Sequence, residues 1–418
     1  MAGEWSMERF ERMAVLVRDT VHPSEAMGLP YVGLEHIAVG SLSLVGTGVA
    51  EDATSLKSRF RRGDILFGKL RPYFRKVIRA PFDGICSTDI WVVRPRAGVD
   101  AGFLFYLMAS DLFIEPVVRA SEGTKMPRAQ WEYACGLDQP LPPQAVQRAI
   151  AQILGTMDDK IELNRRMNET LEAMARALFK SWFVDFDPVR AKAEGRAPGL
   201  PKPLADLLPA RLAASELGEI PDGWEVMALD EIAHFLNGLA LQKFPPTGDR
   251  FLPVIKIAQL RAGNTVDADR ASTELGPEYI VQDGDVLFSW SGSLECVLWA
   301  SGPGALNQHL FKVTSTRYPK WLYYLGVHQH LDDFRRIAAG KATTMGHIQR
   351  HHLSAAKLAV PPPPLLAAMD SILAPLIESQ WRHAVESRTL AVLRDTLLPE
   401  ILQGNIRPTT NQTEEITR

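Results

Sequence analysis

The segment GDILFGKLRP, residues 63–72, has glycines and a lysine at the spacing of a phosphate-binding loop. In such a loop G-x-x-x-x-G-K is followed by Ser or Thr, whose hydroxyl reaches magnesium. Here Leu70 follows the lysine, and the intervening DILF is typical of a strand. The segment GDVLFSWSGS, residues 284–293, repeats the Gly-Asp and the apolar run but lacks Gly-Lys. We therefore interpret Gly-Asp as a turn that enters a buried strand, and not as a nucleotide-binding loop.

Other residues that could support catalysis or bind a metal lack the partners their chemistry needs. The Asp-Asp-Lys at 158–160 resembles part of a nuclease motif, but it lies in a predicted helix without an Asp on a preceding strand. No Asn/Asp-Pro-Pro-aromatic loop is present to hold a flipped base, since DFDPV at 185–189 has a single proline. The histidines within 347–352 offer an i, i+4 pair for zinc with no Cys or carboxylate nearby. We predict no catalytic residue and no metal site.

Composition indicates a protein of two or more globular domains. The chain has 418 residues, of which 46% are hydrophobic and 23% charged. No apolar run approaches the roughly 20 residues that span a bilayer, and the N-terminus lacks the apolar core of a signal peptide. We therefore expect a cytoplasmic protein. The three scattered cysteines fit neither a disulfide framework nor a CxxC metal site, so we expect them to be reduced and buried.

A cationic cluster between residues 57 and 79 stands out against the formal net charge of −3. Its Lys and Arg residues are opposed by a single acid, Asp64, and are interleaved with Phe and Tyr. This pattern is typical of nucleic-acid binding, although an ordinary solvated surface can have the same composition.

The second half of the chain repeats the first. LPYVGLEHI at 29–37 is matched by LPVIKIAQL at 252–260, an offset of 223, and GDILF is matched by GDVLF at an offset of 221. The offset then settles at 219, where GTKM at 123–126 meets ATTM at 342–345. A collinear series of matches indicates two copies of one module.

Each copy ends in a long helix. Residues 144–183 contain no proline and carry apolar residues at alternating spacings of three and four, which predicts a coiled-coil seam with the second copy as its partner. Asn164 and its counterpart His383 are polar positions that either fix the helix register or reflect a loose seam. The predicted seam comprises Ile150, Ile153, Met157, Asn164, Met167, Leu171, Met174 and Leu178, with Met369, Ile372, Leu376, His383, Leu390, Leu393 and Leu397.

These patterns predict an α/β (α+β) protein with two mixed α/β globules separated by two long antiparallel helices. The predicted domains are a first globule at 1–141, a long helix at 142–184, a linker at 185–214, a second globule at 215–361, a second long helix at 362–403 and a polar tail at 404–418. If each globule reads DNA, a paired-helix spacer makes the target two short half-sites separated by unread base pairs.

The candidate DNA-contacting residues are the cations that follow the Gly-Asp strand and a lysine in the later SEGTKM loop, with the corresponding residues of the second copy. They are Lys69, Arg71, Arg75, Lys76 and Lys125 in the first copy, and Ser291, Ser293, Lys341, Thr344 and His347 in the second.

The helix segment LPPQAVQRAIAQILGTMDDKIELNRRMNETLEAMARALFKSWFVDFDPV, together with FGKLRPYFRKV and LGEIPDGWEVMALDEIA, resembles the specificity subunits of type I restriction-modification enzymes. The resemblance covers essentially the whole chain. It implies two target-recognition domains that read a bipartite, asymmetric site in double-stranded DNA, and helices that dock two modification (methyltransferase) subunits, which recruit restriction (translocase and nuclease) subunits. S-adenosylmethionine, ATP and magnesium would then belong to the partners, and this chain would hold no cofactor.

Two alternatives belong to other classes of protein: a helical scaffold that does not contact DNA, and a stand-alone enzyme. DNA affinity that falls steeply with salt distinguishes a DNA reader from a scaffold, because phosphate contacts release counterions. A stand-alone enzyme would be active as the purified chain.

Overall fold

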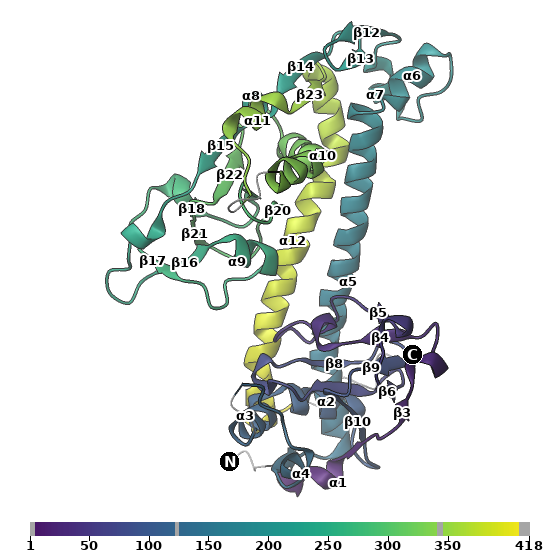
Figure 1. Ribbon diagram of the computed structural model, residues 1–418, viewed down its shortest axis with the longest axis vertical. Coiled ribbons are helices and arrows are strands. Elements are labelled where there is room, and N and C mark those ends of the chain that lie inside the picture. The colour runs from purple at the N-terminus through teal and green to yellow at the C-terminus, as the bar shows by residue number, and fades with distance from the viewer. Residues whose placement is uncertain (1–4, 122–124, 341–345, 409–418) are drawn as a thin grey trace. The chain divides into compact units, whose positions relative to one another are not determined.

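The computed structural model describes residues 5–121, 125–340 and 346–408. The chain forms two compact units, of which unit 1 comprises Met1–Ile161 with Thr389–Arg418, and unit 2 comprises Glu162–Arg388. There are two helices of 40 residues, α5 (Gln144–Phe183) and α12 (Pro363–Leu402) (Figure 1). Each of them has one segment in unit 1 and one segment in unit 2. Each unit therefore combines one mixed α/β globule with a segment of each long helix.

The globule of unit 1 contains two sheets and a separate strand pair. The pair joins β1 (Ser6–Arg9) to β11 (Asp138–Leu141). The antiparallel four-stranded sheet has the order β2 (Ala14–Leu16), β10 (Ile90–Pro95), β7 (Ile65–Gly68), β8 (Val77–Arg79). The five-stranded sheet has the order β3 (Thr20–Val21), β6 (Lys57–Phe60), β9 (Gly84–Cys86), β4 (Pro30–Val32), β5 (Gly48–Val49). The helices are α1 (Phe10–Met13), α2 (Ala101–Ala109), α3 (Asp111–Arg119) and α4 (Trp131–Cys135), with 3-10 turns η1 (Pro23–Glu25), η2 (Leu34–His36), η3 (Ala50–Asp52) and η4 (Pro72–Phe74).

The globule of unit 2 repeats this plan. Its strand pair joins β14 (Glu225–Ala228) to β23 (Lys357–Val360). One four-stranded sheet has the order β15 (His234–Asn237), β22 (Leu310–Thr314), β19 (Val286–Ser289), β20 (Cys296–Leu298). The other has the order β17 (Arg270–Ala271), β16 (Leu252–Ile255), β21 (Gly304–Leu306), β18 (Ile280–Val281). The helices are α8 (Leu229–Ile232), α9 (Ile257–Ala262), α10 (Lys320–Ala339) and α11 (Arg350–Ala355), with 3-10 turns η5 (Leu241–Lys243) and η6 (Pro277–Tyr279).

The repeat predicted from the sequence is confirmed by the strand pairing. In both globules one central pair is parallel: β4 pairs with β9 in unit 1, and β16 pairs with β21 in unit 2. The order β2-β10-β7-β8 corresponds strand for strand to β15-β22-β19-β20. The two units therefore share one architecture.

The Gly-Asp motif forms the turn that the sequence predicts. Gly63 and Gly284 have φ angles of 90° and 87°, in the left-handed region that favours glycine. The carboxylate of Asp64 accepts a hydrogen bond from the Arg61 backbone N–H at 2.8 Å, and Asp285 accepts one from the Gln282 N–H at 2.8 Å. Strands β7 and β19 that follow are fully buried, so this motif starts a core strand in each unit.

The predicted linker, 185–214, is largely folded within unit 2. It contains helices α6 (Asp187–Ala193) and α7 (Lys202–Leu207), and it leads into the hairpin β12 (Leu212–Ser215)–β13 (Gly218–Pro221). Phe186 is buried there, and its ring centroid lies 5.8 Å from that of Trp224. The prolines and glycines of this segment obscured apolar side chains that pack against the end of α5.

The long helices contact each other within each unit. In unit 2 the Asn164 amide donates to Glu386 at 2.8 Å, and the Asn168 amide donates to the Gln380 carbonyl at 2.9 Å. Residue numbers rise along α5 while their partners fall along α12, so these segments run antiparallel. Asn164 is fully buried, and His383 bonds the Asn168 side chain at 3.0 Å. The two polar seam positions thus lie in the contact between α5 and α12.

The buried face of each helix is rotated from the predicted seam. Ile150, Asn164 and Met369 are buried, but Ile153, Met167, Met174 and Leu393 are exposed and do not lie in it. The remaining predicted seam positions are half-buried: Met157, Leu171, Leu178, Ile372, Leu376, His383, Leu390 and Leu397. The buried face also includes Leu154, Ala175, Phe179, Leu373 and Ile377. This shift arises because each helix packs against a globule as well as against the other helix.

Among the described residues, no single helix is long and apolar enough to cross a membrane. The bent pair α2 and α3 passes that test of length and composition only when its helices are taken together.

Candidate nucleic-acid interface

In unit 1 the chain beyond β7 pairs with a second segment. Leu70 forms an antiparallel bridge with Arg128. The Arg71 N–H donates to the Pro127 carbonyl at 2.7 Å, and the Ala129 N–H donates to the Lys69 carbonyl at 2.8 Å. This pairing places Lys125 close to the end of β7, so it brings together three of the candidate residues.

The same pairing occurs in unit 2. Ser291 forms an antiparallel bridge with His347. The Gly292 N–H donates to the Gly346 carbonyl at 2.8 Å, and the Ile348 N–H donates to the Trp290 carbonyl at 2.9 Å. The bridged pairs match by the sequence offsets of 221 and 219. We call this shared backbone arrangement the bridge platform, residues 69–71 with 127–129 in unit 1 and 290–292 with 346–348 in unit 2.

The four cations that follow β7 have different surroundings. Lys69 is half-buried and its ammonium has no partner among the described residues. Arg71 has a φ of 52°, its Nε is buried without a partner in the described chain, and its Nη2 lies 3.4 Å from the Lys125 carbonyl. Arg75 is paired with Asp111. Lys76 donates to the Leu34 carbonyl at 2.5 Å, and burial lowers the pKa of this lysine.

In unit 2 the candidate residues are mostly uncharged. Ser291 is buried, and its hydroxyl lies 3.0 Å from His309 Nδ1. Ser293 is exposed, and the His347 ring meets the Trp290 ring edge-on at 6.3 Å. Lys341 and Thr344 lie outside the described residues.

The sequence analysis missed residues that lie on the bridge platform or contact it. In unit 1 the Lys69 N–H donates to the Asp89 carbonyl at 2.9 Å, and Arg128 Nε lies 3.1 Å from Asp89 Oδ1. In unit 2 the Trp290 N–H points to the His309 carbonyl at 3.4 Å. Asp89 and His309 are equivalent at an offset of 220. That offset was the only available signal, because neither residue belongs to a recognisable motif.

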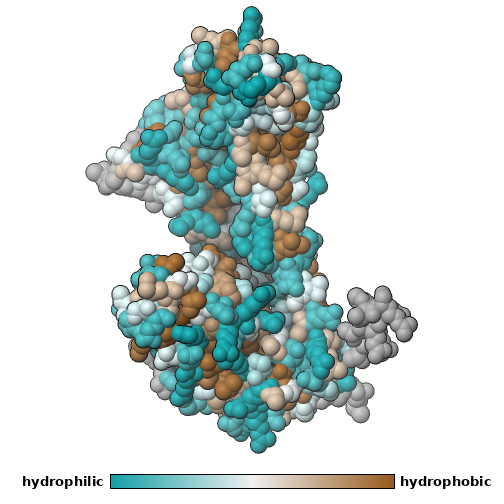
Figure 2. Space-filling view, turned by 90° about the vertical axis from the view of Figure 1, so that its right-hand side faces the viewer, coloured by the Kyte–Doolittle hydropathy of each residue, from teal (hydrophilic) through white to brown (hydrophobic). Residues whose placement is uncertain are grey.

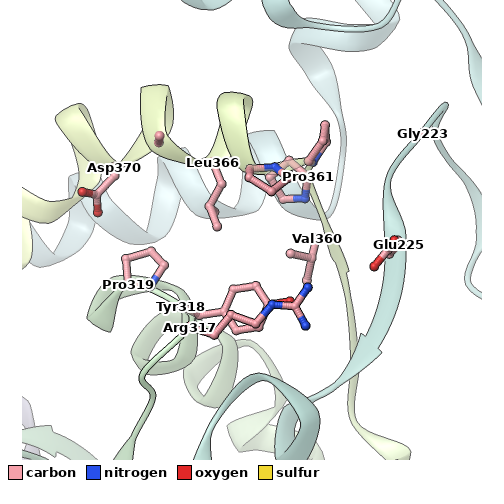
Figure 3. A pocket seen from close by; sticks show the side chains of 12 residues that line it. Gly223, Glu225, Arg317, Tyr318, Pro319, Val360, Pro361, Leu366 and Asp370 are labelled. Atoms are coloured by element: carbon pink, nitrogen blue, oxygen red, sulfur yellow. The ribbon is translucent and has the colours of Figure 1, made fainter.

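A cavity of about 510 Å³ lies at the start of α12 in unit 2. Figure 3 shows Leu366 pointing from α12 towards Tyr318 within it. In unit 1 the residue equivalent to Leu366 is Gln147, whose side chain accepts from the Asp100 N–H and donates to the Pro142 carbonyl, both at 2.8 Å. In unit 2 the residue equivalent to Asp100 is Pro319, which has no N–H.

A helix–helix contact beside this cavity also differs between the two units. Gly102 of α2 lies so close to α5 that an added Cβ would come within 2.7 Å of Ala151. In unit 2 the equivalent pair is Trp321 and Asp370, joined by a hydrogen bond of 2.8 Å. The cavity thus lies where these side chains differ between the two units, and none of the candidate DNA-contacting residues lines it.

In the part of the chain that the structure describes, no three His, Cys, Asp or Glu side chains gather in a way that could hold a metal ion.

Comparison with known proteins shows what this chain is similar to. Residues 221–376 match the family described as Type I restriction modification DNA specificity domain. The type I restriction enzyme HindI specificity subunit of Haemophilus influenzae is 26% identical, over 84% of this chain and 88% of its own. The MjaIX specificity subunit of Methanocaldococcus jannaschii is 26% identical, over 75% and 71%. The crystal structure of the type I restriction-modification system S subunit from M. genitalium covers 95% of this chain and 96% of its own, with 14% identity and a TM-score of 0.56, which supports the fold.

Unit 2 thus carries a DNA specificity domain on a duplicated α/β fold. The chain is similar to specificity subunits of type I restriction-modification systems over most of its length, in agreement with the resemblance seen in the sequence. The matched family is one of DNA specificity domains, and the relatives are named as specificity subunits of type I restriction enzymes.

Proposed function

We propose that this chain reads a bipartite, asymmetric DNA site, with one half-site for each globule. The recognition domains would be residues 1–141 and 215–361. The observation that carries the proposal is the bridge platform, which occurs once in each unit with the same backbone pairing. The side chains on the two platforms differ: Lys69, Leu70 and Arg128 are replaced by Trp290, Ser291 and His347. The same backbone arrangement with different side chains suits a DNA site whose two halves differ in sequence.

Lys69 and Arg71 are the strongest candidates for phosphate or base contacts in unit 1. Neither makes an ion pair with a described residue, whereas Arg75 is neutralised by Asp111 and Lys76 bonds a carbonyl. Lys125 is exposed beside them. In unit 2 we assign the same role to Ser291, Ser293 and His347, and the sequence assigns it to Lys341 and Thr344.

A salt titration of DNA binding tests this assignment. We expect Lys69→Ala and Arg71→Ala, in the full chain assembled with its modification subunits, each to weaken DNA binding several-fold. Each should also reduce the slope of log affinity against log salt by about one, because one phosphate contact is lost. The control is Arg12→Ala, which removes an exposed arginine that is paired with Glu8. Unchanged affinity and slope in both variants would remove these residues from the interface. Wild-type binding that does not depend on salt would favour the scaffold alternative.

We also propose that the long helices dock the modification subunits, which would carry S-adenosylmethionine, with ATP and magnesium in the restriction subunits. In unit 2, α5 exposes Leu163, Met167 and Met174 by 51%, 39% and 48%. Their spacings of four and seven place them on one side of the helix. Figure 2 shows hydrophobic residues along this exposed side of α5. An apolar stripe on the solvent-exposed side of a helix suits a helical partner.

Co-purification tests the docking face. We expect Leu163→Glu with Met167→Glu to abolish assembly with the modification subunits while the chain stays folded, because both side chains are already in contact with water. Ala173→Glu is the matched control, since Ala173 is exposed on another side of the same helix. A complex that survives the double variant, or that Ala173→Glu disrupts equally, would place the contact elsewhere.

A further inference from the structure

We propose that Arg128, held in place by Asp89, is a specificity-determining residue that reads a guanine in the half-site bound by unit 1. The inference rests on the proposed function and names one base contact within it. Neither residue was selected from the sequence; Arg128 lies on the bridge platform, and the Asp89 carbonyl accepts a hydrogen bond from Lys69 of that platform.

The geometry of the pair leaves one edge of the guanidinium available. Arg128 Nε lies 3.1 Å from Asp89 Oδ1, and Nη2 lies 3.4 Å from Oδ2. The carboxylate therefore occupies the Nε–Nη2 edge and fixes the plane of the group. Nη1 and the second Nη2 hydrogen have no partner among the described residues, and 46% of the side chain is exposed. Two parallel donors remain, which match the O6 and N7 acceptors that guanine presents in the major groove.

Both partners are anchored to the end of one core strand. The Lys69 backbone donates to the Asp89 carbonyl, and its own carbonyl accepts from Ala129, next to Arg128. Leu70 bridges Arg128 directly. The pair is thus positioned by β7 and not by a free loop, which base readout requires because a shift of about 1 Å breaks a bidentate contact.

The carboxylate also argues against a phosphate contact. An arginine that only neutralises DNA phosphates would be attracted to them less strongly with an acid beside it, because the Asp89 carboxylate repels the same phosphates. A guanine edge carries no net charge, so Asp89 can orient Arg128 there without that penalty.

Unit 2 provides an internal comparison. At the equivalent positions it has His347 and His309, so no guanidinium occupies its platform. The guanine requirement is therefore expected in one half-site and not at the corresponding position of the other.

The test is selection of binding sites from a randomised duplex library by the full chain assembled with its modification subunits. Arg128→Ala is expected to reduce the preference for guanine at one position of one half-site by roughly 10- to 100-fold, and to leave the other half-site unchanged. Arg128→Lys should lose the same preference, because an ammonium keeps the charge but cannot form the fork. Asp89→Asn should weaken the preference less, since the amide oxygen still accepts from Arg128.

The control is Arg12→Ala. Arg12 is an exposed arginine paired with an acid in the same unit, and it lies just before β2, whose Ala14 pairs with Pro95 at the end of β10 remote from Asp89. If Arg128→Lys binds every sequence as wild type does, while Arg128→Ala weakens all sequences equally, Arg128 contacts phosphate and the inference is wrong. If all Arg128 variants select the wild-type site, the inference also fails. A wild-type complex that selects no bipartite site would refute the proposed function instead.

Discussion

Replacement of Arg394 should destabilise unit 1 far more than replacement of an exposed arginine on the same pair of helices. Arg394 on α12 is only 2% exposed, and its Nη1 lies 2.5 Å from Asp158 Oδ1 on α5. Asp158 also accepts a hydrogen bond of 2.6 Å from the Tyr106 hydroxyl on α2. We call Tyr106, Asp158 and Arg394 the polar triad. It joins the globule of unit 1 to both helix segments of that unit.

The magnitude follows from what Arg394→Ala leaves behind. Removal of one partner from a buried ion pair costs about 3–5 kcal/mol, because the other charge stays desolvated. Asp158 keeps the Tyr106 hydroxyl and a quarter of its side chain in water, so we expect the low end, about 3 kcal/mol. For a unit of this size, at about 2–4 °C per kcal/mol, the melting temperature should fall by roughly 6–12 °C.

The assay is thermal unfolding by calorimetry, with hydrogen exchange to locate the change. Arg165→Ala is the matched control. Arg165 makes ion pairs with Glu162 and Glu169, but its side chain is 46% exposed, so its loss should cost less than about 1 kcal/mol. Asp158→Asn should lie between the two variants, because Arg394 retains Asp395. Equal losses for Arg394→Ala and Arg165→Ala, or loss of protection in unit 2 alone, would refute the reasoning.

Two further predictions concern unit 2. Burial, reinforced by the charge of Arg176, lowers the pKa of His328 to about 3. Below about pH 6.5 the unfolded chain therefore binds a proton at His328 that the folded chain does not bind. The free energy of unfolding should fall as the pH is lowered towards 3, by up to about 1.4 kcal/mol per pH unit. Denaturant midpoints at pH 7.5 and 5.0 should differ less for His328→Gln, and an equal difference would contradict the assignment. Gly284→Ala should cost more than Gly63→Ala in the same measurement. Both glycines have the left-handed conformation, which costs an alanine about 1–2 kcal/mol. Only the new Cβ at 284 would also lie 3.3 Å from the Trp381 ring.

The repeat could be predicted because each copy keeps its own local signals. The Gly-Asp turn needs glycine at a positive φ and an acid that caps the turn, so both copies retain these residues and the offset can be read directly. The long helices were equally evident from their apolar spacing. The bridge between Leu70 and Arg128 was not, because the register of strands far apart in sequence is set by the whole sheet.

The candidate site was predicted only where charge marked it. Lys69, Arg71 and Lys125 do come together, because the chain beyond β7 pairs with the segment that follows Lys125. Asp89 carries no local signal and joins Arg128 only through the pairing of β7 with β10. The seam was displaced for a related reason, since periodicity shows that a helix has a buried face but not how many neighbours share it.

The polar triad also explains why the helices of one chain should pair with each other and not with a second copy. At the positions equivalent to Tyr106, Asp158 and Arg394, unit 2 has Leu325, Ile377 and Ala175, all buried. If α12 paired with α12 of another chain in the same register, Arg394 would meet Ile377, and its charge would be buried without Asp158. Replacement of the triad by its unit 2 counterparts should therefore restore the stability lost in Arg394→Ala, because apolar groups substitute well for a buried ion pair. It should also remove the free-energy cost of burying the Arg394 charge in a pair of α12 helices from two chains. Sedimentation analysis by ultracentrifugation should then detect dimers that the wild-type chain does not form at the same concentration. A triple variant that is stable and remains monomeric would show that the triad does not select the partner.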